Sequence, residues 1–109
     1  MDSVIDPVQA QVDAYNARDI DAFVASYAPE VVITDASGRA IMQGSESIRE
    51  EYGALFDASP DLTAEILGRL ASGEWIVDHE RVSRGGEVRE VLVAYHVVDG
   101  LITRVAMLA

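Results

Sequence analysis

The sequence predicts an α+β domain: three helices, two small strands between the second and third helix, and then a four-stranded antiparallel meander. The spacing of apolar residues and the positions of turns predict it. Apolar residues recur at helical spacing in the first half, and from Leu62 they recur at every second position, as in a strand. Turn sequences then divide the second half into strands. The 109 residues are enough for one domain with its own core, so residues 1–109 are predicted to form a single domain.

Three amphipathic helices are expected before residue 60. Asp6, followed by Pro7 and Gln9, fits a helix start, and Ser3 is the alternative cap. Asp19 caps the second helix, and Gly44 or Ser45 starts the third. Their apolar faces are, in chain order, Val8, Val12 and Tyr15; Ile20, Phe23, Val24 and Tyr27; and Ile48, Tyr52, Leu55 and Phe56.

The stretch from Tyr27 to Gly44 turns the chain from helix to sheet. Pro29 prevents the second helix from continuing, and Glu30–Thr34 is a β-branched run typical of a strand. Asp35–Gly38 forms a turn, and Ala40–Gln43 returns as a second short strand. This arrangement leaves one carboxylate, Asp35, at a strand end.

The meander contains the longest predicted strand, Val88–Val98, between the Arg84–Glu87 turn and the hairpin signal Asp99-Gly100. Its centre is apolar on both faces, whereas antiparallel strands with one wet face alternate. Three helices can cover only one face of the sheet. The sequence therefore predicts a homodimer through an outward face that carries Val91, Val93, Tyr95 and Val97.

Composition excludes several classes of function. Without cysteine or lysine, the chain has no disulfide, thiol nucleophile or catalytic lysine, because all eight basic residues are arginine. A net charge of −11 repels nucleic acid. No apolar run reaches the ~20 residues of a membrane span, and residues 1–10 do not resemble a signal peptide, so a cytoplasmic location is expected. The two histidines lack metal-ligand spacing, and we expect neither metal nor cofactor.

Several stretches match one family without a gap: Asp19-Ile20-Asp21-Ala22, Tyr27-Ala28, Asp35, Gly38, Gly44, Ile48 and Tyr52. The segment from Tyr95 to Ile102 matches its closing hairpin. On these residues the chain resembles the nuclear transport factor 2-like superfamily, and most closely its SnoaL-like and ketosteroid isomerase-like branch. The resemblance implies a cone of curved sheet wrapped on three helices. The fold hosts isomerases, hydrolases, cyclases and pure binders.

The resemblance also implies roles for single residues. Asp35 falls at the position of the isomerases' general base, and Tyr27 and Tyr52 fall where supporting tyrosines line the pocket. Gln11 and Ala94 occupy the positions of the two oxyanion donors. Since losing one such donor typically costs about a hundred- to a thousandfold in rate, we expect negligible ketosteroid isomerisation. The alternative for Asp35 is that it only initiates its turn.

His79 is the second candidate for acid/base chemistry. Strand alternation places it on one face with Trp75, Val77 and Arg81, and the resemblance makes that face the concave one. The same match points Glu90, Leu92, Ala94 and His96 inward, and Asp78 and Glu80 outward. A histidine titrates near neutral pH and could replace the missing donors. The alternative is a structural histidine braced by Glu90.

The sequence thus predicts a homodimeric pocket protein for an organic small molecule. As an enzyme it would be a cofactor-independent acid/base catalyst, with Asp35 as base and His79 as partner in one cavity. The alternatives are a non-catalytic binding or accessory subunit that uses the same cavity, and a purely structural dimerisation module. The predicted substrate-binding residues are Gln11, Tyr15, Tyr27, Tyr52, Trp75, Val77, Glu90, Leu92, Val105 and Met107.

Overall fold

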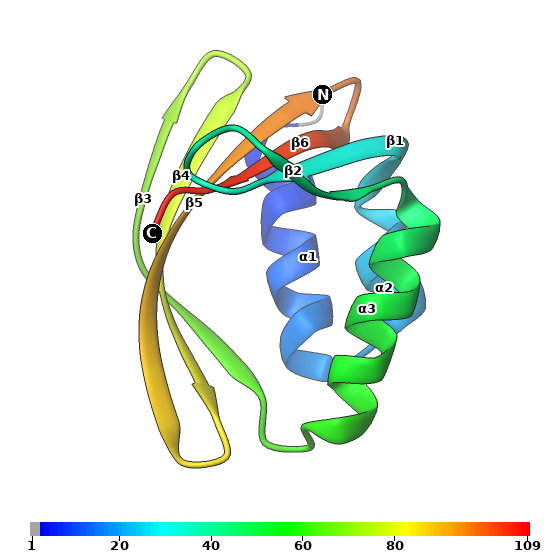
Figure 1. Ribbon diagram of the computed structural model, residues 1–109. Helices are drawn as coiled ribbons and strands as arrows, with labels where there is room; N and C mark the ends of the chain where they lie inside the picture. The colour runs from blue at the N-terminus through cyan, green and yellow to red at the C-terminus, as the bar shows by residue number, and fades with distance from the viewer. Residues whose placement is uncertain (1–2) are drawn as a thin grey trace.

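The structure, a computed structural model, describes residues 3–109. A single curved sheet of six strands wraps around three helices, which all lie on its concave side (Figure 1). The helices are α1 (Ile5–Ala17), α2 (Ile20–Ala25) and α3 (Ser45–Ala58). The strands are β1 (Tyr27–Thr34), β2 (Ala40–Gln43), β3 (Thr63–Ser72), β4 (Trp75–Arg84), β5 (Glu87–Val98) and β6 (Leu101–Met107).

The strand order is β2-β1-β6-β5-β4-β3, so the last strand of the meander pairs with the first strand of the chain. The β1–β6 pair is parallel and all other pairs are antiparallel. The α+β class, the three helices and the meander are therefore confirmed. The sheet is therefore mixed, because β1 and β6 run in the same direction.

Local sequence explains where the first helices begin. The Ser3 hydroxyl accepts a hydrogen bond from the Ile5 amide at 3.2 Å, and the Asp6 carboxylate accepts one from the Ser3 amide at 3.1 Å. Neither predicted residue is the N-cap, which is Val4, but their side chains hold the start of the helix from the positions on either side of it. At the second helix the Asp19 carboxylate accepts from the Ala22 amide at 3.1 Å.

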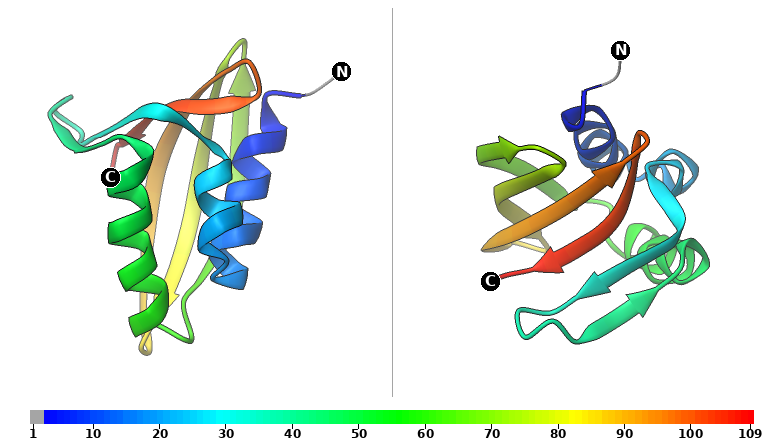
Figure 2. Two further views of the ribbon diagram at one scale, coloured as in Figure 1. Left: turned by 90° about the vertical axis from the view of Figure 1, so that its right-hand side faces the viewer. Right: turned by 90° about the horizontal axis from the view of Figure 1, so that it is seen from above.

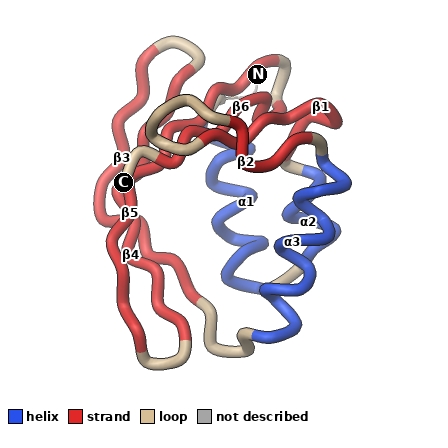
Figure 3. The backbone as a smooth tube through the Cα atoms, in the orientation of Figure 1, coloured by secondary structure: helices blue, strands red, loops and turns tan. Residues whose placement is uncertain are grey.

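The helices pack through an aromatic cluster under the sheet. Tyr15, Phe23, Tyr52 and Phe56 contribute it, with ring centroids 4.8 to 6.4 Å apart. Figures 2 and 3 show the result: a helical layer covers one side, and β3, β4 and β5 extend past it as a long curved wall. Phe23 and Phe56 of this cluster belong to the buried core, and Tyr15 and Tyr52 pack against it.

The register of β4 and β5 follows from a tight turn. Gly85 and Gly86 have positive φ angles of 59° and 82°, and they connect Arg84 directly to Glu87 as a pair. Glu80 then lies opposite Val91, and Ile76 opposite Tyr95. The inward set on the two strands is Ile76, Asp78, Glu80, Val91, Val93, Tyr95 and Val97, all buried.

This register contradicts the predicted orientation of both strands by one residue. Val91, Val93, Tyr95 and Val97 pack against the helices and are not a dimer face. Trp75, at 41% exposure, and Leu92 face away from the helices. The physical reason is that β5 is apolar on both faces, and its more strongly apolar side is the one that the core requires.

Candidate functional site

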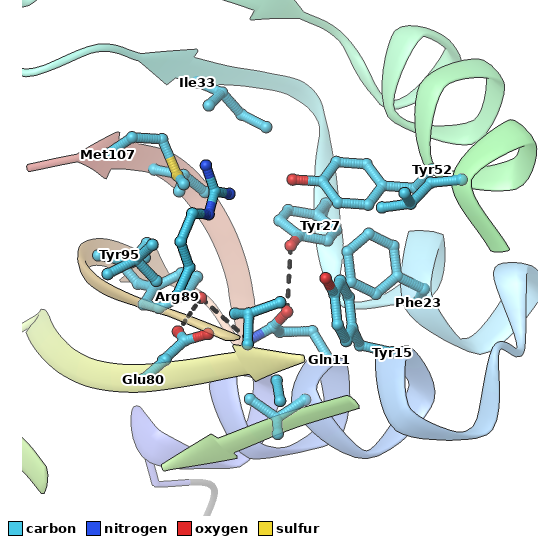
Figure 4. A pocket seen from close by; sticks show the side chains of 17 residues that line it. Gln11, Tyr15, Phe23, Tyr27, Ile33, Tyr52, Glu80, Arg89, Tyr95 and Met107 are labelled. Atoms are coloured by element: carbon cyan, nitrogen blue, oxygen red, sulfur yellow. Dashed lines mark hydrogen bonds between the residues drawn. The ribbon is translucent and has the colours of Figure 1, made fainter. Parts of the chain in front are cut away.

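A cavity of about 180 Å³ lies between the concave face of the sheet and the helices (Figure 4). Each layer contributes to its wall. The helices supply Gln11, Val12, Tyr15, Phe23, Tyr52 and Leu55; the strands supply Tyr27, Ile33, Ala64, Glu80, Val82, Arg89, Val91, Val93, Tyr95, Val105 and Met107. The wall is therefore apolar along β6, and its polar groups are four tyrosines, Gln11, Glu80 and Arg89.

A chain of hydrogen bonds runs through this wall in one direction. The Tyr27 hydroxyl donates to Gln11 Oε1 at 3.4 Å, and Gln11 Nε2 donates to the Tyr95 hydroxyl at 3.2 Å. The Tyr95 hydroxyl in turn donates to Glu80 Oε2 at 3.1 Å. All four residues are buried. The chain therefore ends on a carboxyl group that receives, but does not pass on, a hydrogen bond.

Burial dominates the chemistry of Glu80. Loss of water raises its pKa from 4.5 to about 7. The hydrogen bond from Tyr95 opposes this shift, the negative charge of Asp78 adds to it, and the positive charge of Arg69 opposes it. A carboxyl group with a pKa near 7 exchanges its proton readily at neutral pH, which suits a general acid or base.

The second oxygen of Glu80 is open to the cavity. Within residues 3–109, Oε1 has no hydrogen-bond donor, whereas Oε2 is held by Tyr95. Glu80 Oε1 is also not fully buried. Among the side-chain polar atoms of residues 3–109 that lack a partner, only Ser59 Oγ is fully buried. Glu80 lines the cavity, so this free oxygen is available to a bound molecule.

Four tyrosines surround the cavity as hydroxyl donors. Burial raises the pKa of Tyr15 to about 12, and it also raises the pKa values of Tyr27, Tyr52 and Tyr95. All four hydroxyls therefore keep their protons at neutral pH. Those of Tyr15 and Tyr52 make no hydrogen bond to the rest of residues 3–109, and neither oxygen is sealed from the cavity. They are free to donate to a ligand.

Next to Glu80, the same strand carries a fully paired carboxylate. Arg69 binds Asp78 with both arms, from Nε to Oδ1 at 2.6 Å and from Nη2 to Oδ2 at 2.9 Å. Arg69 Nη1 also donates to Gln9 Oε1 at 2.8 Å, which ties α1 to the sheet. Asp78 has no exposed surface and does not line the cavity.

Half of the predicted site residues lie in the cavity wall. These are Gln11, Tyr15, Tyr27, Tyr52, Val105 and Met107, which come from the helices, β1 and β6. The predicted residues of β4 and β5, and the predicted base, lie elsewhere: Asp35, Trp75, Val77, His79, Glu90 and Leu92. Trp75 stacks on His96 on the outer face, with ring centroids 4.5 Å apart.

The predicted pair Asp35 and His79 does not meet in one cavity, and that prediction is wrong. Asp35 Oδ1 accepts hydrogen bonds from the Ser37 hydroxyl at 2.6 Å and from the amides of Ser37 and Arg39. The Ser37 hydroxyl chiefly lowers the pKa of this carboxyl, with help from the turn's amides, so Asp35 behaves as the turn residue of the alternative interpretation. His79 pairs with Glu90 at 2.7 Å on the outer face, as its structural alternative describes.

Glu80, Arg89 and Tyr95 are the functional candidates that alternation from Trp75 missed. Two signals in the sequence were together sufficient to find them. The Arg84-Gly85-Gly86-Glu87 turn fixes which residues of β4 and β5 are paired, and between residues 90 and 96 the β5 face with Val91, Val93 and Tyr95 lacks the ionisable side chains that Glu90 and His96 place on the other face. Together these observations put Glu80 on the core side.

The fold and the cavity define a small pocket protein of the nuclear transport factor 2-like superfamily. The profile of the SnoaL-like domain matches residues 8–105, and the chain belongs to that family. No curated protein matches the chain.

Solved structures of similar shape include proteins of several bacteria. An uncharacterised cystatin-fold protein from Novosphingobium aromaticivorans is 25% identical, with full coverage of both chains and a TM-score of 0.92. A proposed polyketide cyclase from Sinorhizobium meliloti is 27% identical over 94% of this chain and 93% of its own, with a TM-score of 0.80. A proposed ketosteroid isomerase from Kribbella flavida, at 23% identity, covers 94% of this chain and 74% of its own, with a TM-score of 0.78, and shares the fold.

Two further findings concern residues 3–109. No three side chains of histidine, aspartate or glutamate are placed there to hold a metal ion. None of the three helices in that range is long and apolar enough to cross a membrane.

Proposed function

We propose that the protein is a cofactor-independent acid/base enzyme that acts on a small carbonyl compound, with Glu80 as the proton-transferring group. One observation carries the proposal. A buried carboxyl group with a pKa of about 7 directs an unpartnered oxygen into a cavity. This keeps the reaction type expected from the sequence and replaces the residues assigned to it.

The chemistry needs a base and an acceptor for developing negative charge. Ionised Glu80 removes a proton from the carbon next to the carbonyl group, and the electron pair moves to the carbonyl oxygen. The free hydroxyls of Tyr15 and Tyr52 donate hydrogen bonds to that oxygen as its charge grows. Where the substrate has a C=C bond next to the deprotonated carbon, the enolate is a conjugated dienolate, and protonated Glu80 returns the proton to its far carbon, which moves the C=C bond and completes an isomerisation. If the enolate instead attacks a second carbonyl group, Glu80 protonates the new alkoxide.

Size and neighbours bear on the substrate. The cavity of 180 Å³ is smaller than the ~300–1,000 Å³ of sites for drug-sized ligands. This size favours a substrate smaller than a four-ring steroid, and Gln11 in the cavity wall stands at the position of one oxyanion donor. Ala94, expected at the position of the other donor, lies on the outer face of β5 and does not line the cavity. The structure at 27% identity is described as a proposed polyketide cyclase, and cyclisation of a polyketide also starts by proton removal next to a carbonyl group.

Exchange of α-protons in D₂O tests the proposal without knowledge of the product. A panel of small ketones and keto acids is incubated with the protein and followed by proton NMR. We expect exchange that rises with pH through about 7, and a loss of about 10²- to 10⁴-fold in Glu80→Gln. The control is His79→Gln, which changes a histidine outside the cavity. Equal exchange by Glu80→Gln and the wild type would overturn the role of Glu80.

A non-catalytic binding protein is the second candidate. The relay of hydrogen bonds from Tyr27 to Glu80 favours it, because a buried polar network also serves to fix the shape of a binding site. Saturable binding of a panel compound without any proton exchange would favour this function.

A homodimer remains part of the proposal, through the other side of the sheet. Leu70, Trp75 and Leu92 are exposed there and form an apolar surface that the helices do not cover. Sedimentation of the wild type and of Leu92→Glu tests it, and a monomeric wild type at micromolar concentration would contradict it. The cytoplasmic location and the lack of nucleic-acid and membrane partners stay predictions from composition.

A further inference from the structure

We infer that the ligand carries a carboxylate group, which Arg89 binds at the mouth of the cavity with help from Arg84. This inference rests on the proposed function in one respect: it names the substrate class of the same cavity. The carbonyl end of the ligand lies inside, near Glu80, and the acidic end lies at the mouth. The ligand class is therefore a short organic acid with a carbonyl group, such as a keto acid.

Arg89 occupies an inward position on the sheet despite its charge. It lies opposite Val82 and two residues before Val91, and both of these neighbours line the cavity. Figure 4 shows its side chain reaching over the cavity on the side of Tyr95 and Met107. A second hollow joins the cavity there, and it shares Tyr15, Leu55, Val82 and Arg89 with it. Arg84 lines this outer hollow.

Neither guanidinium is neutralised within residues 3–109. Arg49, Arg69 and Arg81 each pair with a carboxylate, but Arg84 and Arg89 make no ion pair and no side-chain hydrogen bond in that range. Glu87 also lines the outer hollow, and its carboxylate forms no ion pair with either arginine, although Glu87 and Arg84 are opposite each other in the strand ladder. The outer hollow is thus lined by two arginines and one glutamate, a local excess of positive charge in a chain of net charge −11.

The field of the two arginines reaches into the cavity. Both act on Tyr15, where their positive charges partly offset the rise in the pKa of its hydroxyl caused by burial. A guanidinium group binds a carboxylate through two parallel hydrogen bonds, and its rigid fork fixes the orientation of the acid. An acid held this way at the mouth directs its remaining atoms towards Val91, Val93 and Glu80.

A matched pair of ligands isolates the carboxylate. Levulinate, a five-carbon keto acid, is compared with its methyl ester by NMR titration of the wild type. We expect the acid to bind about 10- to 100-fold more tightly than the ester, which is the range for a hydrogen bond to a charged group. Arg89→Gln should remove this preference and leave binding of the ester unchanged. Arg84→Gln should reduce it by a smaller factor.

The control has the same change of charge at a different place. Arg104 lies opposite His96, outside the cavity wall, and Arg104→Gln should keep the preference for the acid. Equal binding of acid and ester, equal effects of Arg89→Gln and Arg104→Gln, or no binding of levulinate at millimolar concentration would overturn the inference.

A further variant separates this inference from the proposed function. Glu80→Gln should still prefer the acid to the ester while it loses proton exchange. If the acid preference is present and exchange is absent in the wild type, the carboxylate site stands and the catalytic proposal fails. If exchange occurs without any acid preference, the reverse holds.

Discussion

Asp78 and Glu80 are two carboxylates on the same face of one strand, two residues apart, and they have opposite roles. Their exposure is nearly the same, 0% and 7%. Asp78 is bound on both oxygens by a guanidinium, whereas Glu80 receives one hydrogen bond from a neutral tyrosine. The difference therefore lies in the partner that each side chain meets and not in burial.

This difference in partners gives Asp78 a structural role and leaves Glu80 as the candidate for proton transfer. The charge of Asp78 is compensated, and Arg69 extends the pair to Gln9 on α1. The burial of Glu80 is offset only in part, by the hydrogen bond from Tyr95 and by the charge of Arg69, which is bound to Asp78, and the pKa of Glu80 rises to about 7. The compensated carboxylate holds a helix against the sheet, and the uncompensated one is ready to exchange a proton. Mutations can test each side of this comparison.

The largest expected effect is on the compensated side. Arg69→Leu leaves Asp78 buried without its partner, and breaking a buried pair in this way costs about 3–5 kcal/mol of unfolding free energy. Urea denaturation at pH 7 measures the loss. The control is Arg81→Gln, because Arg81 and Glu65 form an exposed pair that is worth about 0–1 kcal/mol. Similar losses in the two variants would show that the Arg69 pair is not special.

The next effect concerns Glu80 and has the opposite sign. Its pKa is raised in the folded state, so the folded protein holds a proton that the unfolded chain releases above about 4.5. The contribution of Glu80 to the free energy of unfolding is therefore fully present below pH 4.5, and it is lost as the pH rises to about 7. Glu80→Gln should remove the loss. We expect the variant to gain on the order of 3 kcal/mol relative to the wild type between pH 4.5 and pH 8.

Thermal or urea unfolding of both proteins across this pH range measures the difference. Other titrating groups are common to the two proteins and cancel in the comparison. A difference in stability that does not change with pH would contradict the raised pKa of Glu80. If Glu80→Gln is more stable than the wild type but does not catalyse proton exchange, the buried carboxyl group of the wild type lowers stability in return for activity.

The sequence predicted the architecture because its signals are redundant. Helical stripes, the proline after α2, and the turns at Gly85-Gly86 and Asp99-Gly100 each mark an element independently. The orientation of β4 has no such redundancy. Trp75 and Val77 look more suitable for a core than Asp78 and Glu80, and the inward polar residues are favourable only because Arg69, Tyr95 and a cavity accept them. These partners come from other elements and are not visible along one strand.

The order of the helices and β1 was predicted correctly, although Tyr27, expected in the second helix, belongs to β1, and the base did not transfer. Asp35 is at the end of β1, where the family pattern puts it, yet its carboxylate is held by its own turn. Gln11 lies in the cavity at the position of a missing donor, and here it links Tyr27 to Tyr95. Positions in a shared fold thus kept their location, whereas the proposed proton-transferring group, Glu80, lies on β4, three strands away from β1 in the sheet.

A smaller effect is expected at the link between Glu80 and the relay. Tyr95→Phe removes the hydrogen bond that opposes the rise in the pKa of Glu80, and it leaves the Gln11 amide without its acceptor. We expect a loss of about 1–3 kcal/mol in stability and a pH profile of proton exchange that moves to higher pH. An unchanged midpoint in that profile would show that Tyr95 does not tune Glu80.

The smallest effect is expected on the outer face. His79 and Glu90 are about half exposed, with side-chain exposures of 44% and 54%, and their ion pair lies in water. His79→Gln keeps a hydrogen-bonding side chain at this position, so unfolding free energy should change by no more than about 0.5 kcal/mol. Proton exchange should be unchanged, since the ring does not reach the cavity. A tenfold loss of exchange in this variant would restore the outer histidine as a functional group, and it would remove the distinction between the two faces of β4 on which the role of Glu80 depends.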